Sequence, residues 1–402
     1  MNRLVILSLA LTAVALSGVV AGCDTGTPSG APVSGGTPIE PSATAAATGP
    51  RGAVGRADEM IVTTILSDGR PGTLLVELVS PGGRRRTLAR LPAFGRLPGD
   101  THEPSIGVDP VASDRGFLAV LTDSLGDASE PATVLIVDLL DPAAPPLRIP
   151  APEGGLAWGP GGQLTVTSAG DVDLVDAATG TIRHVAVPKG VDVYPWPTAD
   201  GRGWYAGRRA PGTPATNGPT GVLGIDSVFR EGPLPPLYDA TAASRPFGPI
   251  GERVDATTDA GGRRVFTVAP DGTTGDWYRF PDPRDGREFG NGEVRWTADG
   301  TALWVLDQVP GAYRLVRIDS PGASPTVVAQ WLYQGKPGLG SPPIGFAGIT
   351  ADDSTIVFQR FDGADPPLVR IDTTTGTVEE IVEPPGGRGS TAFAGWAAVG
   401  DR

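Results

Sequence analysis

Two turn motifs recur along the chain and restrict it to a repeated β-hairpin unit. The first is a tryptophan followed by a glycine-containing turn and a β-rich run, at residues 158–162, 196–201 and 296–300. The second is an apolar pair, an aspartate and a turn, as at residues 136–138 and 174–176. An aspartate before a turn accepts hydrogen bonds from backbone N–H groups, and glycine supplies the positive φ that tight hairpins require. Both motifs therefore predict strand–turn–strand units in which the aspartates are structural.

The two motifs alternate, so each repeat is predicted to contain four strands. Strand a precedes the tryptophan turn, strand b follows it, strand c ends at the aspartate, and strand d follows the second turn. Repeats follow one another every ~40–60 residues, a spacing typical of the four-stranded blades of a β-propeller. No long segment between the β-rich runs has the 3.6-residue periodicity of a helix, so the predicted fold class is all-β.

The number of repeats predicts a propeller of seven blades. Six full units fit between residues 104 and 384, while residues 58–92 supply only strands b, c and d. Residues 393–401 supply an isolated strand a with its tryptophan, so we expect the C-terminal strand to complete the first blade and close the ring. Six or eight blades are the alternatives, because the unit at residues 244–290 is weak.

The turns carry a resemblance to known bacterial propellers. The Trp-x-x-Asp-Gly pattern, as at residues 296–300, resembles the Trp-Ser-Pro-Asp-Gly turns of TolB-like propellers. The Ile-Asp-x-x-Thr-Gly pattern, as at residues 371–376, is similar to strands of the broader WD40-like and quinoprotein-like propellers. The resemblance covers residues 58–400 and implies the fold. Its motifs specify a blade and no activity or shared partner.

The N-terminal end has the order of a secretory signal. A cationic start with Arg3 precedes the apolar residues 4–20, and small residues lead to Cys23, the only cysteine. This end resembles the lipobox of bacterial lipoproteins, in which the cysteine is acylated and becomes the N-terminus. The resemblance implies a lipid anchor on Cys23, with the protein on the extracytoplasmic side of the cell membrane. A transmembrane helix or a free cytosolic thiol are the alternatives, and the apolar run is short for a span.

Composition divides the chain into three parts. Residues 1–22 form the predicted signal peptide, and residues 23–56 are a Gly-, Pro-, Ser-, Thr- and Ala-rich segment with few large apolar side chains. Such a segment buries too little surface to offset its ordering entropy, so we expect a disordered tether. Residues 57–402 form the predicted propeller domain. Lysine is nearly absent beside abundant arginine, a bias that resembles a high-GC, actinobacterial genome.

The formal net charge of −13 bears on partners. An acidic surface repels phosphate backbones, which argues against nucleic-acid binding and favours solubility. We expect a monomer that contacts the membrane through the lipid on Cys23.

Residues able to carry catalysis are sparse. The only histidines, His102 and His184, lie in different units without metal-ligand spacing, so we predict no metal site and no cofactor. His184 alternates with apolar residues in a d strand and is expected to be structural or exposed. There is no Gly-x-Ser-x-Gly elbow and no phosphate-binding glycine loop before a helix, and we assign no catalytic residue. A propeller enzyme of hydrolase, lactonase or lyase type is the alternative, and only Asp109, Asp255 and Glu293 lie near inner strand starts.

Long loops mark a candidate binding face. In related propellers, ligands bind on the face built from d-to-a and b-to-c connections, and here those connections are long. Tyrosine and arginine are favoured anchors in interfaces. The candidate residues are His102, Arg208, Arg209, Tyr238, Arg245, Tyr333 and Lys336. The leading function is therefore a membrane-anchored, non-catalytic scaffold that binds or docks an envelope or extracellular protein, peptide or glycan.

Overall fold

The seven sheets of residues 54–397 confirm the all-β prediction. The computed structural model describes residues 54–56, 58–66, 73–91, 108–112, 115–122, 133–150, 155–167, 171–208, 220–232, 253–259, 262–269, 273–280, 294–309, 312–332, 344–350, 352–360, 367–382 and 387–397. By its contacts the chain divides between Pro50 and Arg51. Within the described residues, six sheets have four antiparallel strands and one has three, and the sole helical element is the 3-10 turn η1 (Pro160–Gly162). The described part contains no helix long and apolar enough to cross a membrane.

The first four sheets follow the predicted order of strands. Blade 1 contains β27 (Gly387–Trp396), β1 (Met60–Leu66), β2 (Thr73–Val79) and β3 (Arg85–Leu91). Blade 2 contains β4 (Val108–Ala112), β5 (Phe117–Thr122), β6 (Thr133–Asp138) and β7 (Leu147–Pro150). Blade 3 contains β8 (Leu156–Gly159), β9 (Gln163–Thr167), β10 (Asp171–Asp176) and β11 (Ile182–Ala186). Blade 4 contains β12 (Val191–Pro197), β13 (Gly203–Arg208), β14 (Thr220–Gly224) and β15 (Phe229–Glu231).

The remaining three sheets complete the series. Blade 5, the unit with the weakest sequence pattern, has three strands in the described residues: β16 (Arg253–Asp259), β17 (Gly262–Val268) and β18 (Thr274–Phe280). Blade 6 contains β19 (Val294–Trp296), β20 (Leu303–Val309), β21 (Ala312–Ile318) and β22 (Thr326–Leu332). Blade 7 contains β23 (Ile344–Ile349), β24 (Thr355–Arg360), β25 (Leu368–Asp372) and β26 (Val378–Ile381). The seven sheets are compatible with the predicted seven blades.

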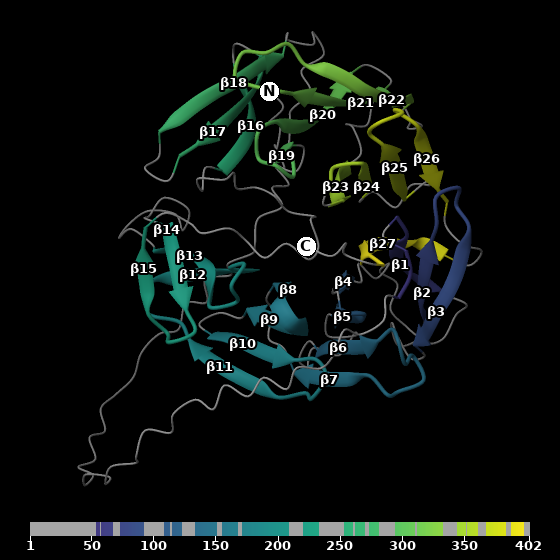
Figure 1. The fold of residues 1–402 in the computed structure, drawn as a ribbon, viewed down its shortest axis with the longest axis vertical. Helices are drawn as coiled ribbons and strands as arrows, with labels where there is room; N and C mark the ends of the chain where they lie inside the picture. The colour runs from purple at the N-terminus through teal and green to yellow at the C-terminus, as the bar shows by residue number, and fades with distance from the viewer. Residues whose placement is uncertain are drawn as a thin grey trace, which may run out of the picture. The chain divides into compact units, whose positions relative to one another are not determined.

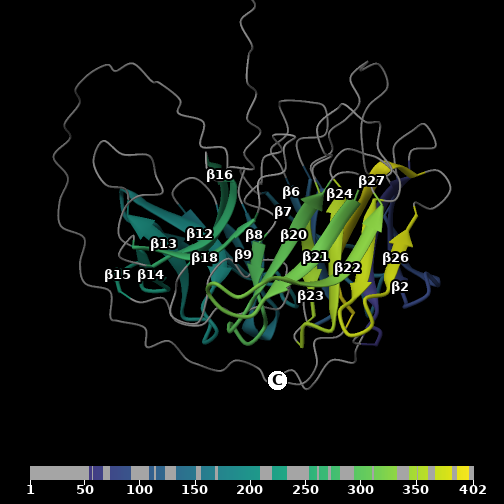
Figure 2. The same cartoon turned by 90° about the horizontal axis from the view of Figure 1, so that it is seen from above.

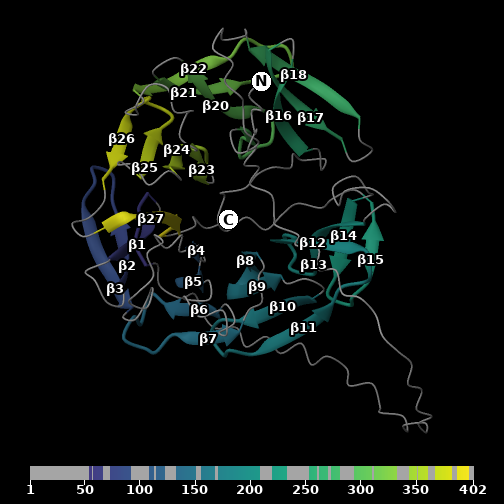
Figure 3. The ribbon, with the colours of Figure 1, turned by 180° about the vertical axis from the view of Figure 1, so that it is seen from behind.

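The sheets are arranged as a β-propeller. Figure 1 shows them following one another around a common centre, with the first strand of each unit innermost and the last outermost. The view from the opposite side in Figure 3 shows the same order. Figure 2, which views these sheets from the edge, shows their strands running through the thickness of the ring. Strands β27 and β4, β4 and β8, β8 and β12, and β16 and β19 are in contact, as neighbouring inner strands should be.

The C-terminal strand closes the first blade, as predicted. Strand β27 pairs antiparallel with β1, in a register that sets Trp396 opposite Met60 and Thr391 opposite Thr64. The hydroxyl groups of Thr64 and Thr391 are 3.0 Å apart and buried. Met60, Trp396 and Phe393 belong to one buried cluster with residues of blade 7, so the closing strand also joins the last blade to the first.

The aspartates at the ends of the c strands are structural, as the motif predicts. Asp138, Asp176, Asp226 and Asp372 each accept a hydrogen bond from the backbone N–H two residues on, at 2.9–3.2 Å. In the tryptophan turn of blade 6, Asp299 accepts hydrogen bonds from the Thr297 hydroxyl and from the Thr301 backbone. These bonds to the charged form lower the pKa of Asp299 to about 2.

Buried apolar clusters join consecutive blades. Within the described residues they lie between blades 1 and 2, 2 and 3, 3 and 4, 5 and 6, 6 and 7, and 7 and 1. Blades 5 and 6 are also joined by charge. Asp307 on β20 is fully buried and lies 2.7 Å from Nη2 of Arg263 on β17, whose side chain is also buried. The other carboxylate oxygen of Asp307 accepts hydrogen bonds from Arg314 on β21.

We expect Asp307→Asn to destabilise the propeller strongly. Removing one charge from a buried ion pair leaves its partners uncompensated and costs about 3–5 kcal/mol. The matched control is Asp319→Asn, because Asp319 pairs with Arg317 at 2.8 Å on the surface, where such a pair contributes about 1 kcal/mol or less. The free energies of unfolding are measured by denaturant titration. Equal losses for the two variants would contradict a bridging role for Asp307.

Candidate functional site

One of the seven predicted binding residues lies in the described part of the chain. Arg208 is the last residue of β13, and its guanidinium lies 2.8 Å from Oε1 of Glu231 and 5.0 Å from the ring centre of Phe229. Half of its side chain is exposed, and both partners belong to the same blade. Arg208 therefore has partners within blade 4, and its role in binding stays a prediction. His102, Arg209, Tyr238, Arg245, Tyr333 and Lys336, together with the lipidation site Cys23, lie outside the described residues.

The residues considered for metal binding or catalysis are placed as follows. His184 is exposed on the outer strand β11, and its Nδ1 lies 2.5 Å from Oδ1 of the cross-strand residue Asp173, in line with a structural or exposed role. Asp109 lies in β4 and Asp255 in β16, both inner strands, while Glu293 lies outside the described residues. Among the described side chains, no group of three or more His, Cys, Asp or Glu is placed to hold a metal ion.

A tryptophan of blade 4 departs from the repeat. Trp158, Trp296 and Trp396 are 1%, 3% and 5% exposed and form part of the core between blades. Trp196 carries the same motif in the sequence, yet its side chain is only half-buried. The turn that follows Trp196 accounts for this difference.

The cause is one extra residue, Pro197. The backbone N–H of Thr198 donates to the carbonyl of Gly203 at 2.8 Å, as that of Thr297 donates to Ala302 at 2.9 Å, so the two threonines are equivalent. The residue before each threonine takes the buried position of the inner strand. In blade 6 this residue is Trp296, but in blade 4 it is Pro197, and Trp196 is displaced by one position.

The displacement turns Trp196 to the other face of the sheet. Val191 and Val193 pack in the cluster shared with blade 3, and a Cβ at Gly155 of blade 3 would lie 2.8 Å from Pro195. The odd-numbered side chains of β12 therefore face blade 3. Because side chains alternate along a strand, the even-numbered ones face the opposite side. These are Asp192, Tyr194 and Trp196.

Tyr194 and Trp196 form a stacked aromatic pair on that face. Their ring centres are 5.4 Å apart and their planes differ by 10°. The pairing of β12 with β13 is irregular here, since Val193 pairs with Ala206 and Pro197 with Trp204. Irregularities of this kind re-aim side chains and are frequent next to binding sites. We call Asp192, Tyr194 and Trp196 the blade 4 aromatic face; all three side chains are half-buried.

The aromatic face combines apolar surface with polar groups. Stacked rings offer a flat apolar surface whose π-faces are electron-rich, a carboxylate such as that of Asp192 accepts hydrogen bonds, and a hydroxyl such as that of Tyr194 both donates and accepts them. Sites for organic ligands generally combine aromatic surface with a few polar groups in this way. Sequence reasoning missed these residues because the tryptophan motif indicates burial. The proline between tryptophan and threonine, absent at residues 296–297, is the signal that distinguishes Trp196.

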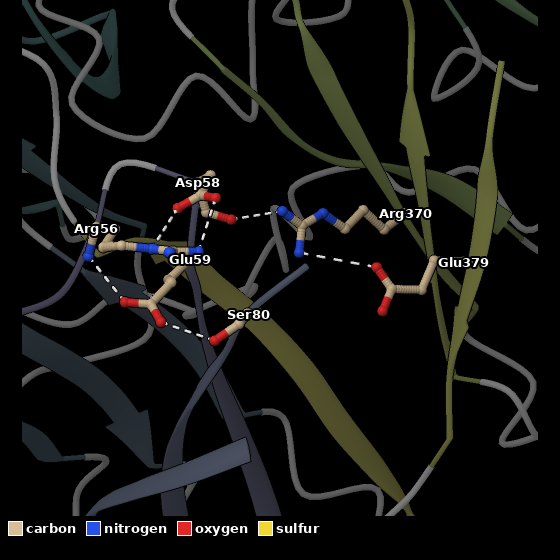
Figure 4. Close-up of polar contacts among 6 residues, drawn as sticks. All are labelled: Arg56, Asp58, Glu59, Ser80, Arg370 and Glu379. Carbon is tan, nitrogen blue, oxygen red and sulfur yellow. Dashed lines mark hydrogen bonds and ion pairs between the residues drawn. The ribbon is translucent and has the colours of Figure 1, made fainter. Parts of the chain in front are cut away.

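A second polar cluster lies where the N-terminal segment enters blade 1 (Figure 4). Glu59 accepts hydrogen bonds from the backbone N–H of Arg56 and from the Ser80 hydroxyl, both at 2.8 Å. The Arg56 guanidinium pairs with the Asp58 carboxylate at 3.0 Å on the surface. Arg370 of blade 7 reaches across and donates to the Asp58 carbonyl at 2.5 Å. The cluster therefore joins residues from the first and last blades.

The chain is similar to known proteins in structure but not detectably in sequence. No protein-family model matches the chain, and no curated protein matches its sequence. Among similar structures, the β-propeller domain of the trilobed protease from Pyrococcus furiosus is 11% identical, with a TM-score of 0.45 over 82% of this chain and 96% of that one. Apo AztD from Citrobacter koseri is 11% identical, with a TM-score of 0.42 over 84% and 99%. TolB from Acinetobacter baumannii is 12% identical, with a TM-score of 0.34 over 83% and 82%. Because these TM-scores lie below 0.5, the fold assignment rests on the strand pairing described above.

We expect Glu59 to make stability depend on pH. The hydrogen bonds from Arg56 and Ser80 hold the pKa of Glu59 below its ordinary value of 4.5. A depressed folded-state pKa contributes stability above the unfolded value, and this contribution is lost as the pH falls through the folded value. Glu59→Gln should therefore reduce stability at pH 7 and show a smaller further loss below pH 4.5 than the native chain. Unfolding titrations at a series of pH values measure the difference, and parallel pH profiles would show that Glu59 is not the group responsible.

Proposed function

We propose that the protein is a lipid-anchored extracytoplasmic lipoprotein whose propeller binds a partner without catalysing a reaction. The blade 4 aromatic face is the observation that carries the binding role. A tryptophan that would fill the core in the repeat register is instead stacked on a tyrosine at a half-buried site on an inner strand. Aromatic residues on a rigid sheet lose little conformational freedom on binding, and tyrosine and tryptophan are frequent hot spots.

The ligand class follows from the chemistry of this face. Its flat aromatic surface beside carboxylate and hydroxyl groups suits a protein, peptide or glycan that presents apolar surface together with hydrogen-bond donors. The net charge of −13 disfavours polyanionic partners such as nucleic acids. The lipid anchor is supported by the N-terminal pattern that ends at Cys23.

The binding proposal is tested by capture from native envelope fractions. The full chain should enrich a saturable partner, and Trp196→Ala and Tyr194→Ala should reduce its capture by about tenfold or more, as loss of an aromatic anchor does. Leu332→Ala, which truncates a side chain that is 73% exposed on the outer strand β22, is the matched control and should capture normally. Thermal unfolding of each variant verifies the fold. Equal capture by all four proteins would refute the role of the aromatic face.

The anchoring proposal is tested by Cys23→Ala. Without the thiol no diacyl group is attached, and an unacylated chain lacks the apolar surface that holds it on a bilayer. We expect the variant to leave the membrane fraction, measured by fractionation and immunoblotting, while metabolic labelling with palmitate marks the native chain alone. A variant that stays in the membrane fraction would show that Cys23 is not the anchor.

A further inference from the structure

We propose that residues 54–59 act as a strap that locks the closure of the propeller and shields it from forces applied to the N-terminal segment. The strap consists of Val54, Gly55, Arg56, Asp58 and Glu59 in the described part of the chain. Val54, Gly55 and Arg56 belong to the segment predicted from the sequence to be a tether, residues 23–56, but in the structure they lie against the blades. Three sets of contacts support the proposal.

The first set attaches the strap to blades 1 and 2. Val54 is 8% exposed and belongs to the buried cluster shared by these two blades. Its carbonyl accepts a hydrogen bond from the Arg86 guanidinium of β3 at 3.0 Å. Gly55 has no room for a side chain, since a Cβ there would lie 2.8 Å from Leu78 and 3.0 Å from Ala397. The start of the strap is therefore closely packed on the propeller.

The second set attaches the strap to blade 7. Arg370 on β25 donates from Nη2 to the carbonyl of Asp58, and its side chain is only 5% exposed. Its Nη1 lies 3.9 Å from the Glu379 carboxylate on β26, an ion pair within blade 7 (Figure 4). The bond from Nη2 of this buried side chain to the Asp58 carbonyl attaches the strap to blade 7. Arg370 thereby links the last blade to the segment that leads into the first.

The third set attaches the strap to the closing strand. The backbone N–H of Ala397, one residue after β27, donates to the carbonyl of Glu59, one residue before β1, at 2.9 Å. This bond extends the β27–β1 ladder beyond the Met60 and Trp396 pair. The strap thus holds the end of the ladder at which the N-terminal segment joins it.

This arrangement changes how a pull on the N-terminal segment reaches the propeller. Without the strap, tension would act on the first residue of β1 and open the ladder one hydrogen bond at a time from that end. With the strap, tension meets the contacts of Val54 with blades 1 and 2, and then that of Asp58 with blade 7, before it reaches β1. Among the described strands, ring closure is the pairing of greatest sequence separation, and its loss would expose the sheet edge of β1.

Hydrogen exchange of the full-length chain tests the strap. We expect replacement of residues 54–59 by glycine and serine, and separately Arg370→Gln, to speed amide exchange in β1 and β27 by about tenfold or more through local opening. Exchange in β9 and β10 of blade 3 should stay unchanged. The matched control replaces residues 43–48 by the same glycine and serine stretch and should leave both regions unchanged.

The possible outcomes distinguish local opening of the β27–β1 pair from destabilisation of the whole propeller. Faster exchange in β1 and β27, with β9 and β10 unchanged, supports the strap. Unchanged exchange in both variants, or an equal increase in all blades, overturns it. The control replaces a segment of the same length that also precedes β1. If a change in composition of this part of the chain were enough to speed exchange, the control would show faster exchange as well. The test is independent of ligand binding and of Cys23.

Discussion

The pairing of β27 with β1 is the interaction on which the rest of the propeller depends. It brings Trp396 opposite Met60, and no other pair of strands in the described residues is so far apart in the chain. Within the described residues, blades 1, 2, 3, 6 and 7 each share a buried apolar cluster with both neighbours, so the first and last blades bury the faces they turn to each other only when the ring is closed. The closing strand supplies Phe393 and Trp396 to the cluster shared by those two blades. Pairing and packing at this junction therefore form together.

Polar contacts specify blade junctions that apolar packing alone would leave free to slide. Hydrophobic contacts are not directional, whereas the attraction between a buried carboxylate and two guanidinium groups depends on where the charges are placed. Asp307 fixes blade 6 against Arg263 of blade 5, and Arg370 fixes blade 7 against the segment before β1. Apolar burial thus stabilises the contacts between blades, and the directed polar contacts fix how neighbouring blades are placed relative to each other.

The parts of the fold that were predictable are those encoded locally. Turn motifs repeat in sequence, so strand order within a blade, the structural role of aspartates such as Asp372, and the closing C-terminal strand all followed from the sequence alone. The links made by Asp307 and Arg370 were not predictable. Both join residues of separate repeats, Arg370 and Asp58 being 312 positions apart, and an arginine in a strand gives no local signal of its partner.

The blade 4 aromatic face was only partly predictable from the sequence. The turn from Thr198 to Gly203 keeps the same hydrogen bonds as its counterpart in blade 6, so the residue inserted as Pro197 could be accommodated only on the strand before the turn. Trp196 lies one position farther from this turn than Trp296 does from its own, and because side chains alternate along a strand it lies on the other face. Pro197 takes the buried position in place of Trp196, and Trp204 lies opposite it on β13, buried, with its indole N–H donating to Thr165 of blade 3 at 2.8 Å. Blade 4 therefore has one buried tryptophan in the core shared with blade 3 and a second, half-buried tryptophan stacked on Tyr194 on the opposite face of β12.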